Sequence, residues 1–149
     1  MNTVLAPVFW QPAQAIDHAQ ERFGVAPPKD FRVLTLLLKE ISGGLQLRTR
    51  SGDWIEAPPI EGTLVCNNGD LLQRWSNDRF LSTVHRVINR TQNARYSISV
   101  FFDPASQTMV DPADLGVAQS DCKHAPISVG KHIASRNAKA FAHLKGKGT

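Results

Sequence analysis

Three residues whose types can do chemistry lie in the stretch Ser82–Pro104. His85 falls in an apolar setting in the first of two predicted strands. Arg95 and Ser97 fall two positions apart in the second, so the two-residue period of a strand places them on one face. An imidazole on one strand and a guanidinium beside a hydroxyl on the next could hold a metal ion and an anionic ligand together. The same residues also fit plain sheet strands with a part-buried histidine and a surface arginine, because single His and Arg residues are weak motifs.

The pair Arg95 and Ser97 suits a carboxylate ligand. A planar guanidinium binds a carboxylate through two hydrogen bonds, and the hydroxyl donates another. The alternative is an arginine that points into solvent, where an ion pair contributes little to stability. Both interpretations remain open on these two residues.

Asp30 opens the first long predicted strand, far from His85 in the sequence. In a jelly roll, two such positions can face each other across the mouth of the barrel. A carboxylate and an imidazole at that place suit a divalent iron site, which typically uses two histidines and one carboxylate. Alternatively, Asp30 is a turn residue that follows Pro27 and Pro28.

Short strands separated by turn residues must position these side chains. We expect strands over residues 31–40, 44–50, 53–57 and 62–67, a short helix over 70–77 capped by Asp70, two strands within 82–104, a short strand near 108–112 and an amphipathic helix over 129–144. Many short strands, turns rich in glycine and proline, and few helices favour a mainly β sandwich or jelly roll. A chain of 149 residues is one domain's worth and is long enough for a hydrophobic core.

The excess of basic over acidic residues is concentrated in the C-terminal tail of the chain. The formal net charge is +4, and basic side chains after residue 120 face the single acid Asp121: Lys123, Lys131, His132, Arg136, Lys139, Lys145 and Lys147. No nucleic-acid motif and no aromatic residue beyond Phe141 accompanies them. We therefore expect a solvated helix face, with His124, His132 and His143 in solvent, and no nucleic-acid partner.

The number of cysteines and the hydropathy of the chain indicate the cellular compartment to expect. Cys66 and Cys122 are too few for a disulfide framework and lack metal-ligand spacing, which favours a reduced, intracellular protein. No apolar stretch is long enough to span a bilayer, and the first residues lack the layout of a signal peptide. We expect a cytoplasmic protein with no membrane partner.

Several motifs in fixed order carry a resemblance to a known family: GGLQ, WIEAPP, NNGD, RWSN, HRV, RYS and FFDP. With them, residues 24–104 resemble the iron- and 2-oxoglutarate-dependent dioxygenases of the isopenicillin N synthase-like group, and the run PISVGKHIASRNAKAFAHL resembles that group's C-terminal helix. From their residues, positions 1–23 are expected to be an irregular segment that includes at most one short strand, near 4–10, without a partner nearby. The resemblance implies a jelly-roll domain (a double-stranded β-helix) over 24–106 and a C-terminal loop and helix of the same domain over 107–149.

The resemblance also implies the chemistry of the site. Asp30 and His85 would be ligands of Fe(II), and Arg95 and Ser97 would hold the far carboxylate of the co-substrate 2-oxoglutarate. The activity implied is dioxygenase-type oxidation of a small organic substrate.

The chain departs from the family pattern beside Asp30. Where the family has His-x-Asp-aromatic-Gly, this chain reads Pro28-Lys29-Asp30-Phe31-Arg32. Proline has no metal-binding side chain, and the Lys29 ammonium opposes a nearby cation. Two alternatives to the enzyme therefore stay open: a degenerate or truncated family member that keeps only an anion-binding clamp, and a basic interaction module.

Family chains are longer at the N-terminus, where helices cover the barrel. Without that covering, we expect strand faces such as Leu34, Leu36 and Leu38 to be exposed. An exposed apolar face of that kind favours a homo-oligomer.

Overall fold

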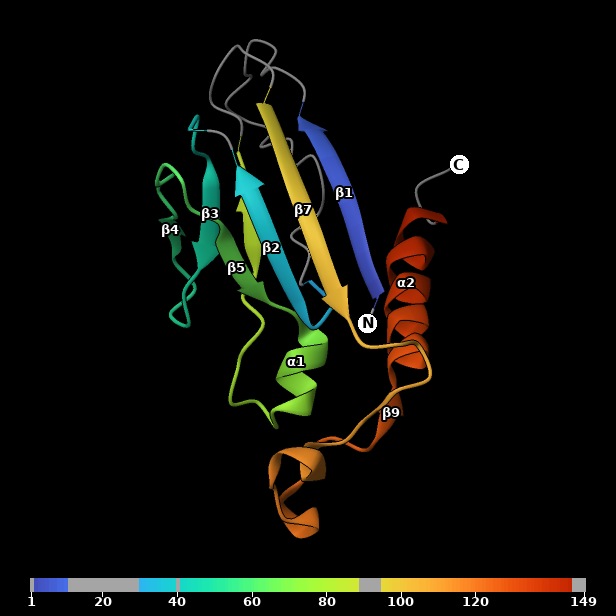
Figure 1. The fold of residues 1–149 in the computed structure, drawn as a ribbon. Helices are drawn as coiled ribbons and strands as arrows, with labels where there is room; N and C mark the ends of the chain where they lie inside the picture. The colour runs from blue at the N-terminus through green and yellow to red at the C-terminus, as the bar shows by residue number, and fades with distance from the viewer. Residues whose placement is uncertain (1, 11–29, 40, 89–94, 146–149) are drawn as a thin grey trace.

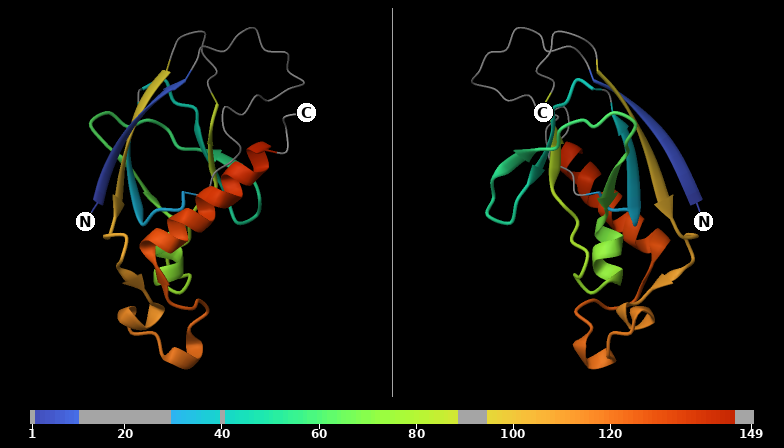
Figure 2. Two further views of the ribbon diagram at one scale, coloured as in Figure 1. Left: turned by 90° about the vertical axis from the view of Figure 1, so that its right-hand side faces the viewer. Right: turned by 60° about the vertical axis from the view of Figure 1, so that its left-hand side comes forward.

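The computed structural model describes residues 2–10, 30–39, 41–88 and 95–145, with the backbone alone for 2–10, 95 and 140–145. Two antiparallel sheets face each other as two layers (Figures 1 and 2). The larger sheet, here called the major sheet, has the strand order β1 (Asn2–Trp10), β7 (Arg95–Asp103), β2 (Leu34–Lys39) and β5 (Val65–Asn68). The smaller, or minor, sheet has the order β4 (Trp54–Glu56), β3 (Leu45–Arg48) and β6 (His85–Val87). This arrangement confirms the mainly β, jelly-roll prediction.

The remaining elements lie at one end of the barrel and along its side (Figure 1). They are the short helix α1 (Asp70–Trp75), the hairpin of β8 (Met109–Val110) and β9 (Ile127–Ser128), the 3-10 turns η1 (Pro112–Leu115) and η2 (Gln119–Asp121), and the C-terminal helix α2 (Val129–Lys145). Leu71, Val110 and Val129 are fully buried together, with Val33 and Ile133 packed against them. This apolar cluster fixes α1 and the start of α2 to the barrel.

The two strands of Ser82–Pro104 belong to different sheets. β6 pairs with β3, so that Leu47 lies opposite His85. β7 pairs with β1 on one side and β2 on the other. The stretch is therefore not a hairpin but a crossing between the two layers, which places His85 on one sheet and Ser97 on the other.

The N-terminus is more regular than predicted. Residues 2–10, expected to be irregular or one short strand without a partner, form a nine-residue strand paired with β7 from Asn2↔Asp103 to Trp10↔Arg95. The prediction was wrong here because the partner strand lies about ninety residues away in the sequence, beyond the reach of local pattern reading. Pro7 is tolerated because β1 is an edge strand of the sheet.

The two faces of the major sheet differ in polarity. Side chains on one face alternate with those on the other, and the register places Thr35, Lys39, Ser97 and Asp103 on the inner face. The outer face carries only uncharged residues in its described part: Leu34, Leu36, Leu38, Cys66, Asn68, Tyr96, Ile98, Val100 and Phe102. Leu38 is 49% exposed and Ile98 38%. Of the three leucines predicted to be exposed, Leu38 is exposed, whereas Leu34 and Leu36 are half-buried.

The C-terminal tail is docked through His124, His132 and Arg136, which corrects the expectation that these side chains are solvated. Lys123, Lys131 and Lys139 are exposed as expected, and the side chain of His143 lies outside the described residues. His132 is only 4% exposed, and its Nε2 lies 3.7 Å from Oδ2 of Asp70. Arg136 forms an ion pair with the same carboxylate. His124 Nε2 lies 3.0 Å from Oδ1 of Asp78, a contact that lowers the pKa of that carboxyl group. These two histidines are scattered in the sequence, but the fold brings each to an acid of the α1 region.

Asp70 also differs from the prediction that it caps α1. Gly69 is the residue before the helix, no side chain caps it, and Asp70 is the first helical residue. A carboxylate in the first turn is favourable to the helix dipole. Its oxygen is bound by Arg136 of α2 instead of by the backbone of its own helix.

The buried His132 makes a pH-dependent contribution to stability. Desolvation lowers the pKa of His132; Arg136 and Arg74 act in the same direction, and Asp70 and a hydrogen bond to the Phe31 backbone oppose them. The unfolded chain therefore binds more protons than the folded chain just below pH 6.5, so stability rises with pH in that window. We expect the free energy of unfolding to reach its plateau above pH 6.5 and to fall as the pH drops below that value. The fall should be at most about 1.4 kcal/mol per pH unit.

Urea denaturation of the natural chain and of His132→Gln across this range measures the effect. The variant should lose the slope. Parallel curves for the two proteins would show that His132 does not carry it.

Candidate active site

Asp30 is held at the start of β2 by contacts on both its carboxylate and its backbone. Oδ1 accepts a hydrogen bond of 3.0 Å from the backbone N–H of Arg32, and Oδ2 accepts one from the hydroxyl of Thr35. Its carbonyl oxygen accepts the N–H of Asp70 at 2.6 Å. Asp30 therefore precedes a bend at Arg32 and Val33, and its carboxylate is fixed in place by these contacts. Hydrogen-bonded carboxylates of this kind are typical of metal ligands.

Three consecutive backbone donors at the start of α1 hold the loop that carries Asp30. The N–H groups of Gly69, Asp70 and Leu71 bind the carbonyls of Val33, Asp30 and Arg32, at 3.0, 2.6 and 3.2 Å. The approach is so close that a Cβ on Gly69 would overlap the carbonyl oxygen of Arg32. Only glycine fits at that position with this backbone.

His85 is half-buried at the start of β6, and its ring is oriented by the backbone. Its Nδ1 lies 3.2 Å from the carbonyl oxygen of Thr83. When Nδ1–H donates to that carbonyl, Nε2 carries the lone pair, which is the usual arrangement of a metal-binding histidine. The geometry favours the ligand interpretation of His85.

Asp30 and His85 lie at the same end of the barrel. Ser82, three positions before His85, has its hydroxyl 3.4 Å from the carbonyl oxygen of Asp30. No group of three His, Cys, Asp or Glu side chains that could hold a metal occurs among the residues that the structure describes. Pro28, which stands at the position of the third ligand, lies outside them. The residues present thus fit an iron ion with two protein donors and leave the third position to other ligands.

Arg32 is directed to Asp103 and not to Asp30. Its Nη1 lies 2.6 Å from Oδ2 of Asp103, which is 3% exposed and whose Oδ1 accepts the N–H of Val33 at 3.1 Å. The guanidinium lies 5.7 Å from the ring of Phe31 and 5.5 Å from that of Phe101. The bulk of an arginine in place of the family's glycine is therefore accommodated, and its charge is neutralised away from the proposed metal.

Ser97 is buried on the inner face of β7, in register with Lys39 of β2 and Val8 of β1. Arg95 begins the strand opposite Trp10, and its side chain lies outside the described part of the chain. Lys39 extends across the barrel to the minor-sheet side, where its Nζ donates to the carbonyls of Ala57 at 2.7 Å and Pro58 at 3.3 Å. Sequence analysis missed this cation, although the two-residue period of β2 puts it on the inner face with Thr35.

Breaking the ion pair between Arg32 and Asp103 tests its structural role. Arg32→Gly restores the family residue but leaves a buried carboxylate with one backbone donor. We expect a loss of about 2–4 kcal/mol in the free energy of unfolding. The paired variant Arg32→Gly with Asp103→Asn should recover part of that loss, because no uncompensated charge remains. Chemical denaturation measures both. An unchanged stability in Arg32→Gly would contradict the role assigned to the pair.

Comparison with known proteins places this geometry in a family. The profile of the 2OG-Fe(II) oxygenase superfamily matches residues 10–104. The probable iron/ascorbate oxidoreductase DDB_G0283291 of Dictyostelium discoideum is 37% identical over 144 residues, covering 87% of this chain and 39% of the relative. The homoarginine-6-hydroxylase 2-ODD-C23 of Glycine max is 44% identical over 92 residues, covering 61% of this chain and 28% of the relative.

Solved structures agree with the sequence comparisons. A full-length Neurospora crassa protein crystallised in complex with alpha-KG superimposes with a TM-score of 0.83 at 33% identity, covering 92% of this chain and 44% of that one. A putative 2OG-Fe(II) oxygenase family protein from Caulobacter crescentus gives a TM-score of 0.77 at 30% identity, covering 93% and 46%. The match spans less than half the length of each of these proteins. By sequence profile, fold and similarity to its relatives, the chain belongs to the 2OG-Fe(II) oxygenase superfamily.

Proposed function

We propose that this chain is the catalytic part of an Fe(II)- and 2-oxoglutarate-dependent oxidoreductase that oxidises a small organic substrate. The observation that carries the proposal is the pairing of donors at one barrel end: an Asp30 carboxylate fixed by two hydrogen bonds and a His85 ring whose Nδ1 faces a carbonyl. The order of motifs from GGLQ to FFDP supports the isopenicillin N synthase-like group. Relatives at 37% and 44% identity are named as an oxidoreductase and a hydroxylase.

Each residue has a stated role in this proposal. Asp30 and His85 supply the two protein ligands of iron, and Arg95 with Ser97 binds the far carboxylate of 2-oxoglutarate. Bound iron with its co-substrate supplies the oxidising chemistry of the family. The chain itself orients the donors: the Thr83 carbonyl lies where it accepts Nδ1–H of His85 in the metal-binding tautomer, and Thr35 and the Arg32 amide hold the carboxylate oxygens of Asp30. Lys39, in register with Ser97, adds positive charge to the inner face near the clamp.

Restoring the third ligand tests the metal site. We expect the natural chain, mixed with Fe(II) and 2-oxoglutarate without oxygen, to show a weak visible charge-transfer band. Pro28→His should bind iron more than about tenfold tighter, a gain of over about 1.4 kcal/mol, because the imidazole completes the two-histidine, one-carboxylate set. His85→Ala in either background should abolish the band. A Pro28→His chain that folds but shows neither band nor 2-oxoglutarate turnover would sink the enzyme proposal.

Replacing Arg95 tests the clamp. Arg95→Gln should weaken 2-oxoglutarate binding by at least about tenfold, because it removes a charged, two-pronged donor. Arg95→Lys should recover only part of the affinity, since an ammonium cannot make the bidentate contact. Isothermal titration of 2-oxoglutarate with Mn(II) in place of iron measures both. Equal binding by all three proteins would exclude Arg95 as the clamp.

A non-catalytic family member is the second candidate, and Pro28 is the observation that favours it. It predicts 2-oxoglutarate binding that depends on Arg95 without any iron-dependent turnover. The third interpretation, a basic interaction module, loses support because basic tail residues are engaged: Arg136 pairs with Asp70, and Lys123 lies 3.4 Å from Asp78.

We also propose that a second copy of the chain covers the outer face of the major sheet. In Figure 1 this face is turned to the viewer, and no helix of the described part of the chain lies over it. Its central residues are uncharged, so two copies can pack face to face without burying a charge. Leu38 and Ile98, opposite each other in the register, lie at its exposed part.

A charge on this face should prevent the association. We expect a concentration-dependent dimer for the natural chain and a monomer for Leu38→Lys, because a dimer would bury the unpaired ammonium. Sedimentation velocity measures the two states. Lys131→Glu, on the exposed side of α2, is the matched control and should still dimerise. A natural chain that stays monomeric at high concentration would contradict the proposal.

The compartment is a further part of the proposal. Cys66 and Cys122 are both free thiols, and Cys66 is exposed. Free thiols support a reducing, cytoplasmic setting. No helix in the described part of the chain is long and apolar enough to cross a membrane.

A further inference from the structure

A hollow of about 540 Å³, with polar and apolar lining residues, opens at the barrel end that holds Asp30 and His85. It lies between the turn that follows β3, the end of β5 and the segment that leads into β6. Ten residues line it: Arg48, Thr49, Arg50, Asn68, Arg79, Phe80, Leu81, Ser82, Thr83 and Val84. Its volume falls within the range of small-molecule sites.

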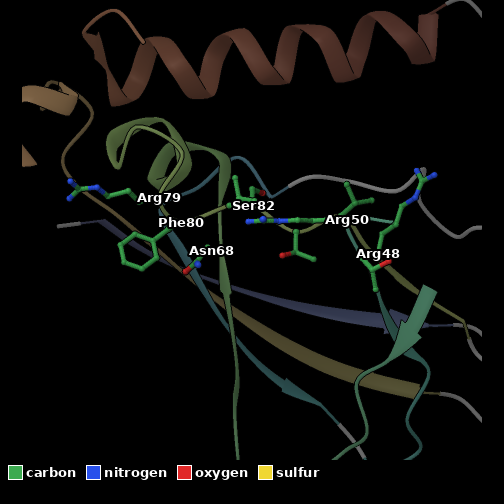
Figure 3. Close-up of a pocket in the computed structure, with 10 residues that line it drawn as sticks. Arg48, Arg50, Asn68, Arg79, Phe80 and Ser82 are labelled. Atoms are coloured by element: carbon green, nitrogen blue, oxygen red, sulfur yellow. The ribbon is translucent and has the colours of Figure 1, made fainter. Parts of the chain in front are cut away.

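The lining carries three positive charges and no acidic side chain. Arg48 is partly engaged, because its Nε donates to the carbonyl of Gly52 at 3.2 Å. Arg50 and Arg79 have no hydrogen-bond or ion-pair partner for their side chains within the described ranges. In Figure 3, Arg50 extends across the hollow toward Ser82, while Arg48 and Arg79 lie toward its two ends. The hollow therefore presents one central guanidinium between two flanking ones.

Neutral polar groups complete the lining near Arg50. Ser82 is only 6% exposed, and its hydroxyl makes a single long contact of 3.4 Å with the Asp30 carbonyl. The side chains of Asn68 and Thr83 also lack a hydrogen-bond partner within the part of the chain described. Hydroxyl and amide donors beside a guanidinium are the groups that bind an oxyanion.

The hollow lies beside the residues proposed to bind the metal. Thr83 and Val84 line it and directly precede His85, and the Thr83 carbonyl orients the His85 ring. Ser82 contacts the loop of Asp30 from the same side. Ser97, by contrast, lies six residues along β7 from Asp103. Asp103 is the residue that binds Arg32 in the Asp30 loop. The arginines of the hollow are thus separate from the proposed 2-oxoglutarate clamp.

We propose that this hollow binds an oxyanion group, a carboxylate or a phosphate, of the substrate, with Arg50 as the anchor. The identification of the bound molecule as the substrate rests on the proposed function. The binding of an oxyanion rests on the lining residues alone. Arg50 binds the group through its guanidinium fork, and Thr83 and Asn68 provide the neutral donors. Arg48 and Arg79 raise the local potential and attract the anionic molecule into the hollow. The substrate class is therefore a small molecule with an anionic group at the end that enters this hollow.

Anion binding is measured without iron and without 2-oxoglutarate, so that it does not depend on the catalytic proposal. Inorganic phosphate and acetate are titrated separately into the ¹⁵N-labelled chain, and the amide resonances of residues 82–84 and the Arg50 Nε–H resonance are followed by NMR. We expect saturable shifts at these groups with at least one of the two probes. Tighter binding of phosphate indicates a phosphate-bearing substrate, and tighter binding of acetate indicates a carboxylate.

The variants separate a built site from general positive charge. Arg50→Gln should weaken binding by at least about tenfold, and Arg50→Lys should keep part of it because the charge remains. Lys131→Gln removes the same charge from an exposed position of α2 and should leave binding unchanged. Shifts scattered over the surface, or equal losses in Arg50→Gln and Lys131→Gln, would overturn the proposal.

The two proposals fail independently. If an anion binds at Arg50 but the chain shows no iron band, the anion-binding proposal stands and the enzyme proposal is excluded. If the chain binds iron and 2-oxoglutarate but shows no Arg50-dependent anion binding, only the anion-binding proposal is excluded.

Discussion

The contact between the start of α1 and the Asp30 loop is the constraint on which the site depends. A helix leaves its first backbone N–H groups without partners inside the helix. Here the N–H groups of Gly69, Asp70 and Leu71 are satisfied by carbonyls of the loop 30–33. The same contact fixes the turn that carries the Asp30 carboxylate. The backbone of Gly69 lies so close to the Arg32 carbonyl that a side chain at this position would displace the loop.

The C-terminal tail supports this contact from behind. His132 and Arg136 of α2 meet Asp70 at the start of α1, and His132 also bonds to the backbone of Phe31. The tail therefore contacts this region through the carboxylate of Asp70, which is neither a proposed iron ligand nor part of the proposed 2-oxoglutarate clamp. Arg32 and Asp103 tie the other side of the same loop to the end of β7. A segment of a few residues is thus held by a helix, a tail and a sheet.

Local features of the fold were predictable from the sequence, and long-range pairings were not. The hairpin of β3 and β4, the helix α1 and the C-terminal helix follow from turn residues and periodicity, which act over a few positions. The partner of β1, the separation of β6 from β7 and the ion pair of Arg32 with Asp103 join residues far apart in the chain. His132 was expected in solvent because its burial depends on a helix docking that no local pattern encodes. Asp30, His85, Arg95 and Ser97 are proposed as site residues from residue type and motif order, while the arginine-lined hollow comes from three separate segments and appears only in the fold.

The pairing of β1 with β7 also orders the events of synthesis. β1 leaves the ribosome well before β7, which ends at Asp103. During all the intervening translation, β1 has no strand of its own sheet beside it, since β7 is its only neighbour in the described part of that sheet. The major sheet therefore closes late, when β7 enters between two strands made earlier, and a non-local closure of this kind is slow and exposed to aggregation. An interruption of synthesis before residue 95 would leave β1 without a partner and one edge of β2 open, in a chain that already contains Asp30 and His85.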